Sequence, residues 1–193
     1  MVSHRPSARV ETFKLDRPVN LPYPEKTEGK KYWHSATVKR FPSRRGKVFL
    51  DELPETSFVV AHGTLGKLGR AGVPGASSIR VAKQKFAHGL QLHPPSWGTS
   101  RVTYRLGGAY TKLSAGVAVA ENGNLGKKVK GTLTFEIWGD GKKLAEKAGI
   151  KTCGKPFPIT ADITGVDSLV LVVRCAGTSA SAWATWLNPV LEK

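Results

Sequence analysis

The 193-residue chain has little acidic charge and no long apolar run. Its 14 Asp and Glu residues are opposed by 30 Lys and Arg, which gives a formal net charge of +16 at pH 7. Such a field attracts polyanions such as nucleic acid, anionic lipid or acidic glycan, although a solvated basic surface has the same composition. Because no run of about 18 apolar residues occurs, we expect no membrane-spanning helix. Residues 1–6 lead into no hydrophobic segment, so we also expect no secretory signal in this sequence.

Cysteine is scarce as well. The only two cysteines are Cys153 and Cys175. Neither has a histidine or a second cysteine at the spacing of metal ligands, so a zinc site is not expected. The two residues could form one disulfide or remain thiols. We favour thiols, because isolated cysteines are often simply small core residues.

The motifs of common enzyme classes are also missing. The sequence has no Gly-x-Ser-x-Gly, no His-Glu-x-x-His, no P-loop and no paired-carboxylate motif. Of its five histidines, only His88 and His93 lie close together, and their odd spacing should place them on opposite faces of a strand. We expect no catalytic activity, no metal and no cofactor. We expect His88 to be half-buried and hydrogen-bonded to the backbone.

The first quarter of the chain differs from the rest. Residues 1–47 hold 12 Lys and Arg against 4 Asp and Glu, which is half of the net charge, and several X-Pro pairs there disfavour helix. Aromatic residues are interleaved, whereas a purely disordered linker usually lacks them. We expect an extended basic arm that binds an acidic partner or nucleic acid. The residues expected to make these contacts are Lys30, Lys31, Lys39, Arg40, Arg44 and Arg45.

From residue 48 onward the pattern is that of short strands. Apolar and polar residues alternate at 101–106, 132–138 and 168–173, and no segment sustains a helical period. The pattern predicts an all-β domain over residues 48–193: an antiparallel, jelly-roll-like β-sandwich of roughly eight to ten strands, with a hairpin turn at 139–142. The core should be formed by the apolar members of these runs: Leu90, Leu92, Val102, Tyr104, Leu106, Val117, Val119, Leu133, Phe135, Ile137, Leu169, Leu171 and Val173.

The residues best placed to bind a ligand are a histidine and two tryptophans. His93 precedes a Pro-Pro turn, where side chains face a loop rim, and Trp97 follows in the same loop. A loop tryptophan either covers the end of a sandwich or offers a flat face to a sugar ring. Trp183 and Trp186 lie three apart, so we expect one to be buried and one exposed. The predicted site therefore consists of His93, Trp97 and Trp183.

Several blocks of the chain occur in the order found in a known family. They are Phe-Leu-Asp-Glu-Leu-Pro at 49–54, Gly-Leu-Gln-Leu-His-Pro-Pro-Ser at 89–96, Tyr-Arg-Leu-Gly-Gly at 104–108, Phe-Glu-Ile-Trp-Gly-Asp-Gly-Lys-Lys-Leu at 135–144 and Trp-Leu-Asn-Pro-Val-Leu at 186–191. In these blocks the sequence resembles the NPCBM family, whose sugar-binding members form carbohydrate-binding module family 51. The resemblance implies a β-sandwich, recognition of galactose-type or related glycans, and an extracellular or periplasmic location.

The sequence departs from the family pattern in two loops. Ala182 and Trp183 stand where the family usually has an acidic residue and a histidine, and the usual Trp-Gly near residues 60–65 reads Ala61-His62-Gly63. Two functions therefore stay open. One is a non-catalytic carbohydrate-binding domain. The other is the same scaffold used as a structural or assembly subunit, which docks through its basic arm on a larger complex that could contain nucleic acid.

Overall fold

The computed structural model describes residues 47–73, 75–121 and 128–193. Residues 1–46 of the predicted arm, which include its six basic residues, therefore lie outside the described part, whereas Lys47, the last residue of the predicted arm, begins the first strand. Within the described ranges the chain forms twelve strands and one short 3-10 helix, η1 (Leu50–Glu52), and every strand pairing is antiparallel. None of these residues forms a helix long and apolar enough to cross a bilayer.

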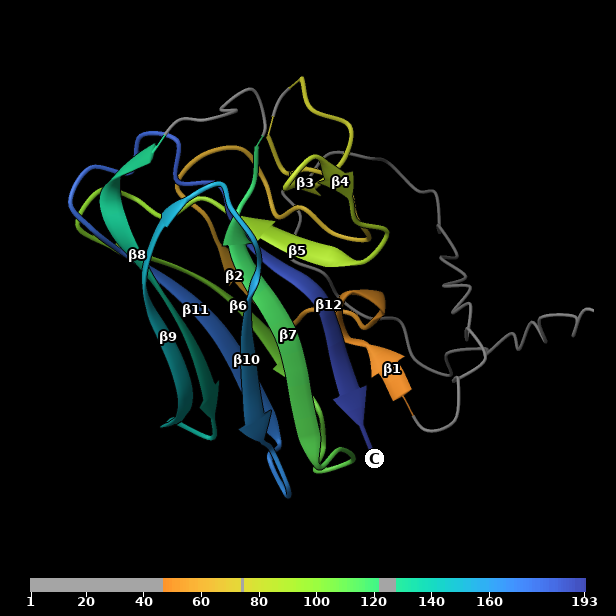
Figure 1. Ribbon diagram of the computed structural model, residues 1–193. Coiled ribbons are helices and arrows are strands. Elements are labelled where there is room, and N and C mark those ends of the chain that lie inside the picture. Colours follow the sequence, from red (N-terminus) through yellow and green to blue (C-terminus); the bar gives the residue numbers. More distant parts are fainter. Residues whose placement is uncertain (1–46, 74, 122–127) are drawn as a thin grey trace, which may run out of the picture. The chain divides into compact units, whose positions relative to one another are not determined.

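Two sheets pack face to face (Figure 1). The first, sheet A, has the order β1-β12-β7-β10, with β5 also pairing with β12. Its strands are β1 (Lys47–Phe49), β5 (Gly89–Leu92), β7 (Lys112–Val119), β10 (Phe157–Asp162) and β12 (Ala184–Glu192). The second, sheet B, has the order β2-β6-β11-β8-β9. Its strands are β2 (Ser57–Val59), β6 (Thr99–Arg105), β8 (Lys128–Gly139), β9 (Lys142–Thr152) and β11 (Ser168–Ala176).

Because apolar and polar residues alternate along the strands, the apolar side chains of both sheets point into the space between them. Along β6 and β11, buried residues alternate with exposed or half-exposed ones, as expected for strands with one solvated face. All thirteen residues predicted for the core are buried. Phe135 of β8 meets Trp186 of β12 edge to face, with ring centroids 5.3 Å apart, and so joins the two sheets. The predicted all-β sandwich is confirmed.

The hairpin turn predicted at 139–142 joins β8 to β9. Asp140 and Gly141 both have positive φ, at 47° and 79°, which is the geometry of a tight two-residue hairpin loop. The Asp140 carboxylate also accepts hydrogen bonds from the backbone N–H groups of Asp167 and Ser168, at 3.1 and 2.8 Å. These bonds favour the ionised form and lower the pKa of Asp140.

Three of the described strands, β9, β3 and β4, lie outside the segments in which apolar and polar residues alternate most clearly. β9 has no clean alternation in sequence, because it is an edge strand with lysines along it. β3 (Arg80–Val81) and β4 (Gln84–Lys85) form a separate two-stranded hairpin. Around it, Ile79 and Val81 pack against Ala118 and Leu187 of sheet A. This hairpin therefore covers part of the outer face of sheet A.

Both cysteines are thiols. Cys175 is buried and Cys153 is half-buried, and neither is in a disulfide. Burial raises the pKa of both thiols, so the uncharged form is favoured. The thiol interpretation is confirmed.

Candidate functional site

Three loops meet at one end of the sandwich, the upper end in Figure 1. They follow β2 (residues 60–65), follow β5 (residues 93–98) and precede β12 (residues 177–183). Because β5 pairs with β12 antiparallel, with Leu92 opposite Ala184, the end of one strand lies beside the start of the other. The Ala61 N–H donates to the His93 carbonyl at 2.9 Å and attaches the first loop to the second. We call this region the loop end.

Three rings pack together at the loop end. The ring centroids of His93 and Trp183 are 4.5 Å apart in an edge-on arrangement. His62 completes the cluster, at 5.8 Å from His93 and 5.7 Å from Trp183. Residues from three separate loops thus form one aromatic surface, as binding sites on a rigid scaffold commonly do.

His93 has an imidazole nitrogen without a partner. The side chain is half-buried, and its Nδ1 is shielded from solvent but makes no hydrogen bond to the described residues. Burial lowers the pKa of His93, and the neighbouring His62 lowers it further, although the backbone at Pro94 and Ser179 opposes the shift. The ring is therefore neutral at pH 7 and can both donate and accept a hydrogen bond. Polar atoms of three fully buried residues, Gln91, Tyr104 and Trp186, also lack a partner among the described residues, and His93 differs from them in being only half-buried.

Trp183 is buried, contrary to the expectation that one of the paired tryptophans is exposed. Its exposed fraction is 8%, and that of Trp186 is 0%. The alternation rule fails because Trp183 precedes β12 and lies in a turn, where its N–H donates to the carbonyl of Ser181 at 2.9 Å and Ser181 has a φ of 65°. The indole of Trp183 lies beneath the two histidines rather than open to a ligand.

Trp97 is the open member of the predicted set. Its exposed fraction is 80%, and its φ of 54° lies in the left-handed region that bulky residues rarely adopt. The loop holds this conformation through the Trp97 N–H, which donates to the Gly177 carbonyl at 3.0 Å. In the described structure Trp97 makes no ring contact with the three-ring cluster, so His93 and Trp183 are brought together and Trp97 stands apart from them.

Serine hydroxyls join the two loops that carry His93 and Trp183. The Ser179 N–H donates to Oγ of Ser96 at 3.0 Å, and the two hydroxyl oxygens are 3.2 Å apart. Since Ser96 is exposed and neighbours Trp97, the rim of the loop end carries polar groups next to an aromatic face. Aromatic faces and a few polar groups are what a sugar site requires.

His62 is the site residue that the sequence reasoning did not select. It was noted only as a departure from a family pattern, in a glycine-containing loop without periodicity. Its place beside His93 depends on the long-range bond from Ala61, which no local pattern reveals. The only indication in the sequence was that His62 lies in the loop where the family usually has Trp-Gly.

His88 lies at the opposite end of β5 and has a structural role. Its Nδ1 is 3.1 Å from Oδ1 of the fully buried Asp51, and its ring stacks on Phe49 with centroids 3.6 Å apart. Asp51 also accepts the Gly89 N–H at 2.7 Å. Burial raises the pKa of Asp51 despite these bonds. The expected partner of His88 was the backbone, whereas its partner is a carboxylate.

Metal binding finds no support in this part of the chain. Across residues 47–73, 75–121 and 128–193, no three His, Cys, Asp or Glu side chains gather closely enough to hold an ion. The arrangement at the loop end is suited to stacking and hydrogen bonding.

Comparison with known families gives one match. The profile of the family described as NPCBM/NEW2 domain matches residues 46–192. No curated protein matches the chain in sequence.

Solved structures of low sequence identity have a similar fold. CBM51-2 in complex with GlcNAc and INT domains from Clostridium perfringens ZmpB aligns with a TM-score of 0.64 at 20% identity, over 76% of this chain and 31% of that chain. CBM51 from Clostridium perfringens GH95 in complex with methyl-galactose aligns with a TM-score of 0.62 at 19% identity, over 75% of this chain and 99% of that chain. The tandem CBM51 modules of Sp3GH98, the family 98 glycoside hydrolase from Streptococcus pneumoniae SP3-BS71, align with a TM-score of 0.62 at 18% identity, over 86% of this chain and 52% of that chain.

The chain thus spans about a third of the first of these structures and nearly all of the second. At this level of identity the likeness establishes the sandwich fold.

Proposed function

Since the chain belongs to the NPCBM/NEW2 domain family, we propose that it is a non-catalytic carbohydrate-binding domain whose site is the loop end. The observation that carries the proposal is that the loops of the loop end present an 80%-exposed Trp97 and, separately, a cluster of His62, His93 and Trp183. Family membership gives the class of ligand, and the loop end supplies the chemistry that such a ligand needs.

Each residue has a separate role in this proposal. The face of Trp97 stacks on the C–H-rich face of a pyranose, because its backbone is already held in position and few rotors need to be fixed. His93, whose pKa is lowered so that the neutral form is favoured, is half-buried and hydrogen-bonds a hydroxyl through the part of its imidazole that is open to solvent. Trp183 supports the two histidines from below.

The ligand we propose is a neutral glycan of galactose type or a related sugar. The structurally similar CBM51 domains include one described in complex with methyl-galactose and one described with GlcNAc. The loops at residues 60–65, 93–98 and 177–183 contain no Lys, Arg, Asp or Glu, and the side chains proposed to face the ligand are indoles, hydroxyls and imidazoles. A neutral hydroxyl-rich ligand matches them better than an anion does.

The test is calorimetric titration of methyl galactoside and N-acetylglucosamine into wild-type protein and two variants. Trp97→Ala should weaken binding about tenfold or more, and His93→Gln should weaken it less. Phe157→Ala is the matched control, because it removes an exposed aromatic ring, 40% exposed, from β10. Binding that is unchanged in Trp97→Ala, or wild-type protein that binds neither sugar nor any member of a glycan array, would contradict the proposal.

A further inference from the structure

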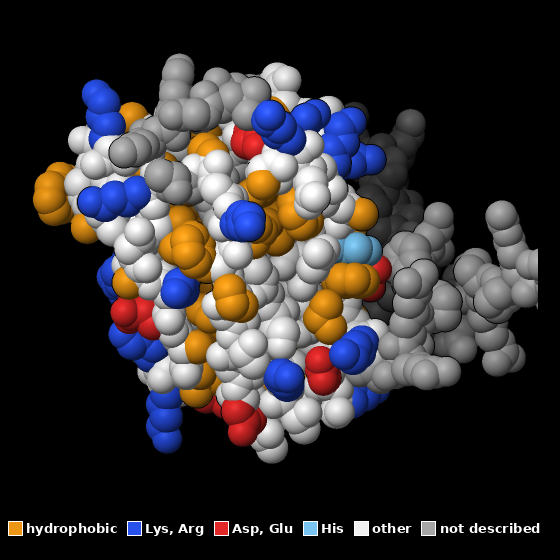
Figure 2. Space-filling model, in the orientation of Figure 1, with side chains coloured by type: hydrophobic (Ala, Val, Ile, Leu, Met, Phe, Trp, Pro, Cys, Tyr) orange, Lys and Arg blue, Asp and Glu red, His pale blue; other side chains and the backbone are white. Residues whose placement is uncertain are grey.

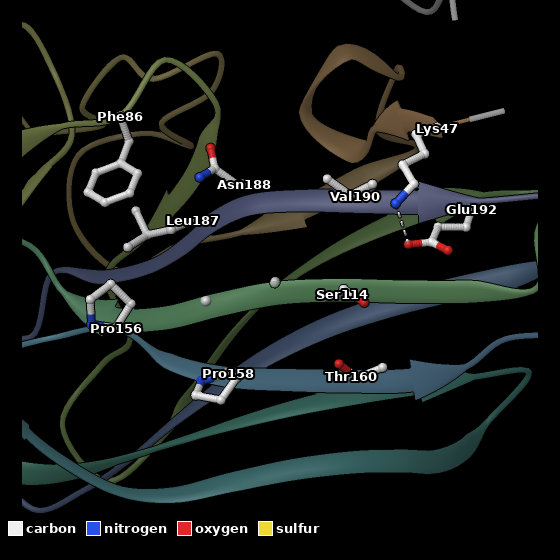
Figure 3. Close-up of a pocket in the computed structure, with 12 residues that line it drawn as sticks. Lys47, Phe86, Ser114, Pro156, Pro158, Thr160, Leu187, Asn188, Val190 and Glu192 are labelled. Carbon is white, nitrogen blue, oxygen red and sulfur yellow. Dashed lines mark ion pairs between the residues drawn. The ribbon is translucent and has the colours of Figure 1, made fainter. Parts of the chain in front are cut away.

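The outer face of sheet A carries a shallow groove of about 440 Å³, separate from the loop end (Figure 3). None of the loop-end residues lines it. Its lining includes two rows of residues that register across β12, β7 and β10: Val190, Ser114 and Thr160 in one row, and Leu187, Gly116 and Pro158 in the other. We call it the outer groove.

Small residues keep the outer groove open. Gly116 has no side chain, and a Cβ placed there would lie 3.1 Å from Cβ of Pro156. Phe86, at the base of the β3–β4 hairpin, and Leu187 form an apolar wall at one end. Figure 3 shows Pro156 and Pro158 facing this wall from the other side. The groove therefore offers apolar surface at its sides above a floor that a ring can approach closely.

Three polar side chains face the outer groove without a partner. Ser114, Thr160 and Asn188 all line it, and none of their side chains forms a hydrogen bond to another described residue. Asn188 lies in a β-bulge of β12 with a φ of 45°, and its N–H is held by the His88 carbonyl at 3.2 Å. Bulges re-aim side chains, and asparagine tolerates this backbone conformation better than most residues. Figure 3 shows the Asn188 amide above the groove.

The charged residues at the end of the outer groove are paired with each other. Lys47 and Glu192 lie 3.1 Å apart, and this contact lowers the pKa of Glu192. In Figure 2, which shows this face, side chains of both signs lie close together near its lower edge. Among the described residues, no other Lys, Arg, Asp or Glu lines the groove. The described lining therefore has one cation and one anion, in a chain of net charge +16.

We propose that the outer groove is a second carbohydrate site, which takes one or two neutral hexose units of a longer glycan. Its size falls in the range of small-molecule sites, about 300–1,000 Å³, and its mixture of apolar walls with a few free polar groups is typical of them. An added peptide strand pairs at a free edge of a sheet, whereas the groove lies on the face of sheet A; of β12, β7 and β10, only β10 has an unpaired side. A polyanion needs unpaired cations, which the described lining lacks.

Two-dimensional NMR of the 15N-labelled full chain separates this site from the loop end. The probes are methyl galactoside, N-acetylglucosamine and an N-acetyllactosamine tetrasaccharide, each titrated to about 10 mM, a range that detects weak sites. We expect the tetrasaccharide to shift the amide signals of Ser114, Gly116 and Thr160 with an affinity of its own. The monosaccharides should shift mainly the loop end.

Variants then assign the signals. Ser114→Leu fills the floor, and Asn188→Gly keeps the positive φ while removing the amide. Both should abolish or weaken the groove shifts at least fivefold and leave the loop-end shifts unchanged. Lys112→Ala is the control, because Lys112 lies opposite Glu192 on β7 but outside the groove. Trp97→Ala should do the reverse and remove only the loop-end shifts.

Each outcome of these experiments either supports or overturns the second site. Groove shifts that survive in Trp97→Ala and disappear in Ser114→Leu support the second site even if the loop end binds nothing. The proposal is overturned if no probe shifts the groove signals in wild-type protein, or if both groove variants, checked for a native spectrum, bind like wild type. It is also overturned if translational diffusion shows that shifts on this face come from association of two copies of the chain.

Discussion

The two ends of β5 carry one histidine each, and the two residues are in opposite situations. At one end, His88 binds the buried Asp51 and stacks on Phe49, so its ring is satisfied within the fold. At the other end, His93 has a shielded nitrogen with no partner among the described residues. The strand between them has only four residues. The same residue type therefore stabilises the sandwich at one end and is left available at the other.

The difference shows where stability and binding separate in this fold. A buried polar atom without a partner costs about 1–3 kcal/mol, so a protein under pressure for stability alone would lose it. The His93 end keeps such an atom, together with the strained backbone of Trp97. At the His88 end, by contrast, the imidazole and the buried carboxylate of Asp51 have each other as partners. Substitutions at the two ends should therefore have opposite consequences.

Substitutions in the core should lower the free energy of unfolding more than substitutions at either end of β5. Phe135→Ala removes the ring that meets Trp186 between the sheets, and Trp186 pairs with Leu90 in the middle of β5. We expect a loss of about 3–5 kcal/mol in the free energy of unfolding, measured by chemical denaturation. Leu171→Ala should have a similar effect, of about 2–5 kcal/mol. A loss below about 1 kcal/mol would mean that the ring is not part of a tightly packed core.

The next largest effect should come from the His88 end. Asp51→Ala leaves both His88 and the buried Gly89 N–H without their acceptor. We expect a loss of about 3 kcal/mol in stability. Asp51→Asn, which keeps one acceptor oxygen, is the control and should lose less. Sugar affinity at the loop end should change little in both variants. A loss of affinity that accompanies the loss of stability would show that the two ends of β5 do not have separate roles.

At the His93 end, the expected effect is a dependence of the protein's stability on pH. The folded state holds the pKa of His93 below its ordinary value of 6.5, so the unfolded chain takes up a proton first as the pH falls. Stability is then lost as the pH falls from 7.5 to 5.5, by at most about 1.4 kcal/mol per pH unit from this group. Denaturation of wild type and His93→Gln at both pH values measures the difference. If the two proteins have the same pH dependence, His93 is not shielded as described.

The smallest effect should be that of salt on glycan binding. A neutral sugar at the loop end displaces few ions, so raising the salt from about 0.05 to 0.5 M should change its affinity by less than about twofold. The arm hypothesis predicts the contrary for single-stranded RNA: steep salt dependence in the full chain, with weaker binding and a shallower slope in a fragment of residues 48–193. The fragment should keep a cooperative thermal transition. Equal RNA binding by both proteins would exclude the arm as the contact.

The core was predictable because alternation is a local property. Leu133, Phe135 and Ile137 reveal their shared face by spacing alone, and all three are buried. The hairpin turn at 139–142 implies a strand after it, but the alternation does not show how far β9 extends, because an edge strand needs no apolar face and lysines interrupt the pattern.

The site was only partly predictable because long-range contacts create it. His93 and Trp97 were selected from the chemistry of one loop. His62 lies beside His93 because a backbone hydrogen bond joins their two loops. Trp183 was expected to follow the alternation of the last strand, but the turn before β12 buries it. Loop geometry of this kind is set by tertiary packing and not by local sequence.

The exposure of Trp97 also gives the protein an optical reporter. Of the four tryptophans in residues 48–193, Trp183 and Trp186 are buried, Trp138 is half-buried, and Trp97 has four fifths of its side chain in water. A collisional quencher such as acrylamide reaches an indole only where solvent does. In a fragment of residues 48–193 it should therefore dim the Trp97 emission first, and a sugar resting on that ring should protect it. Occupancy of the loop end can then be followed by fluorescence without a label.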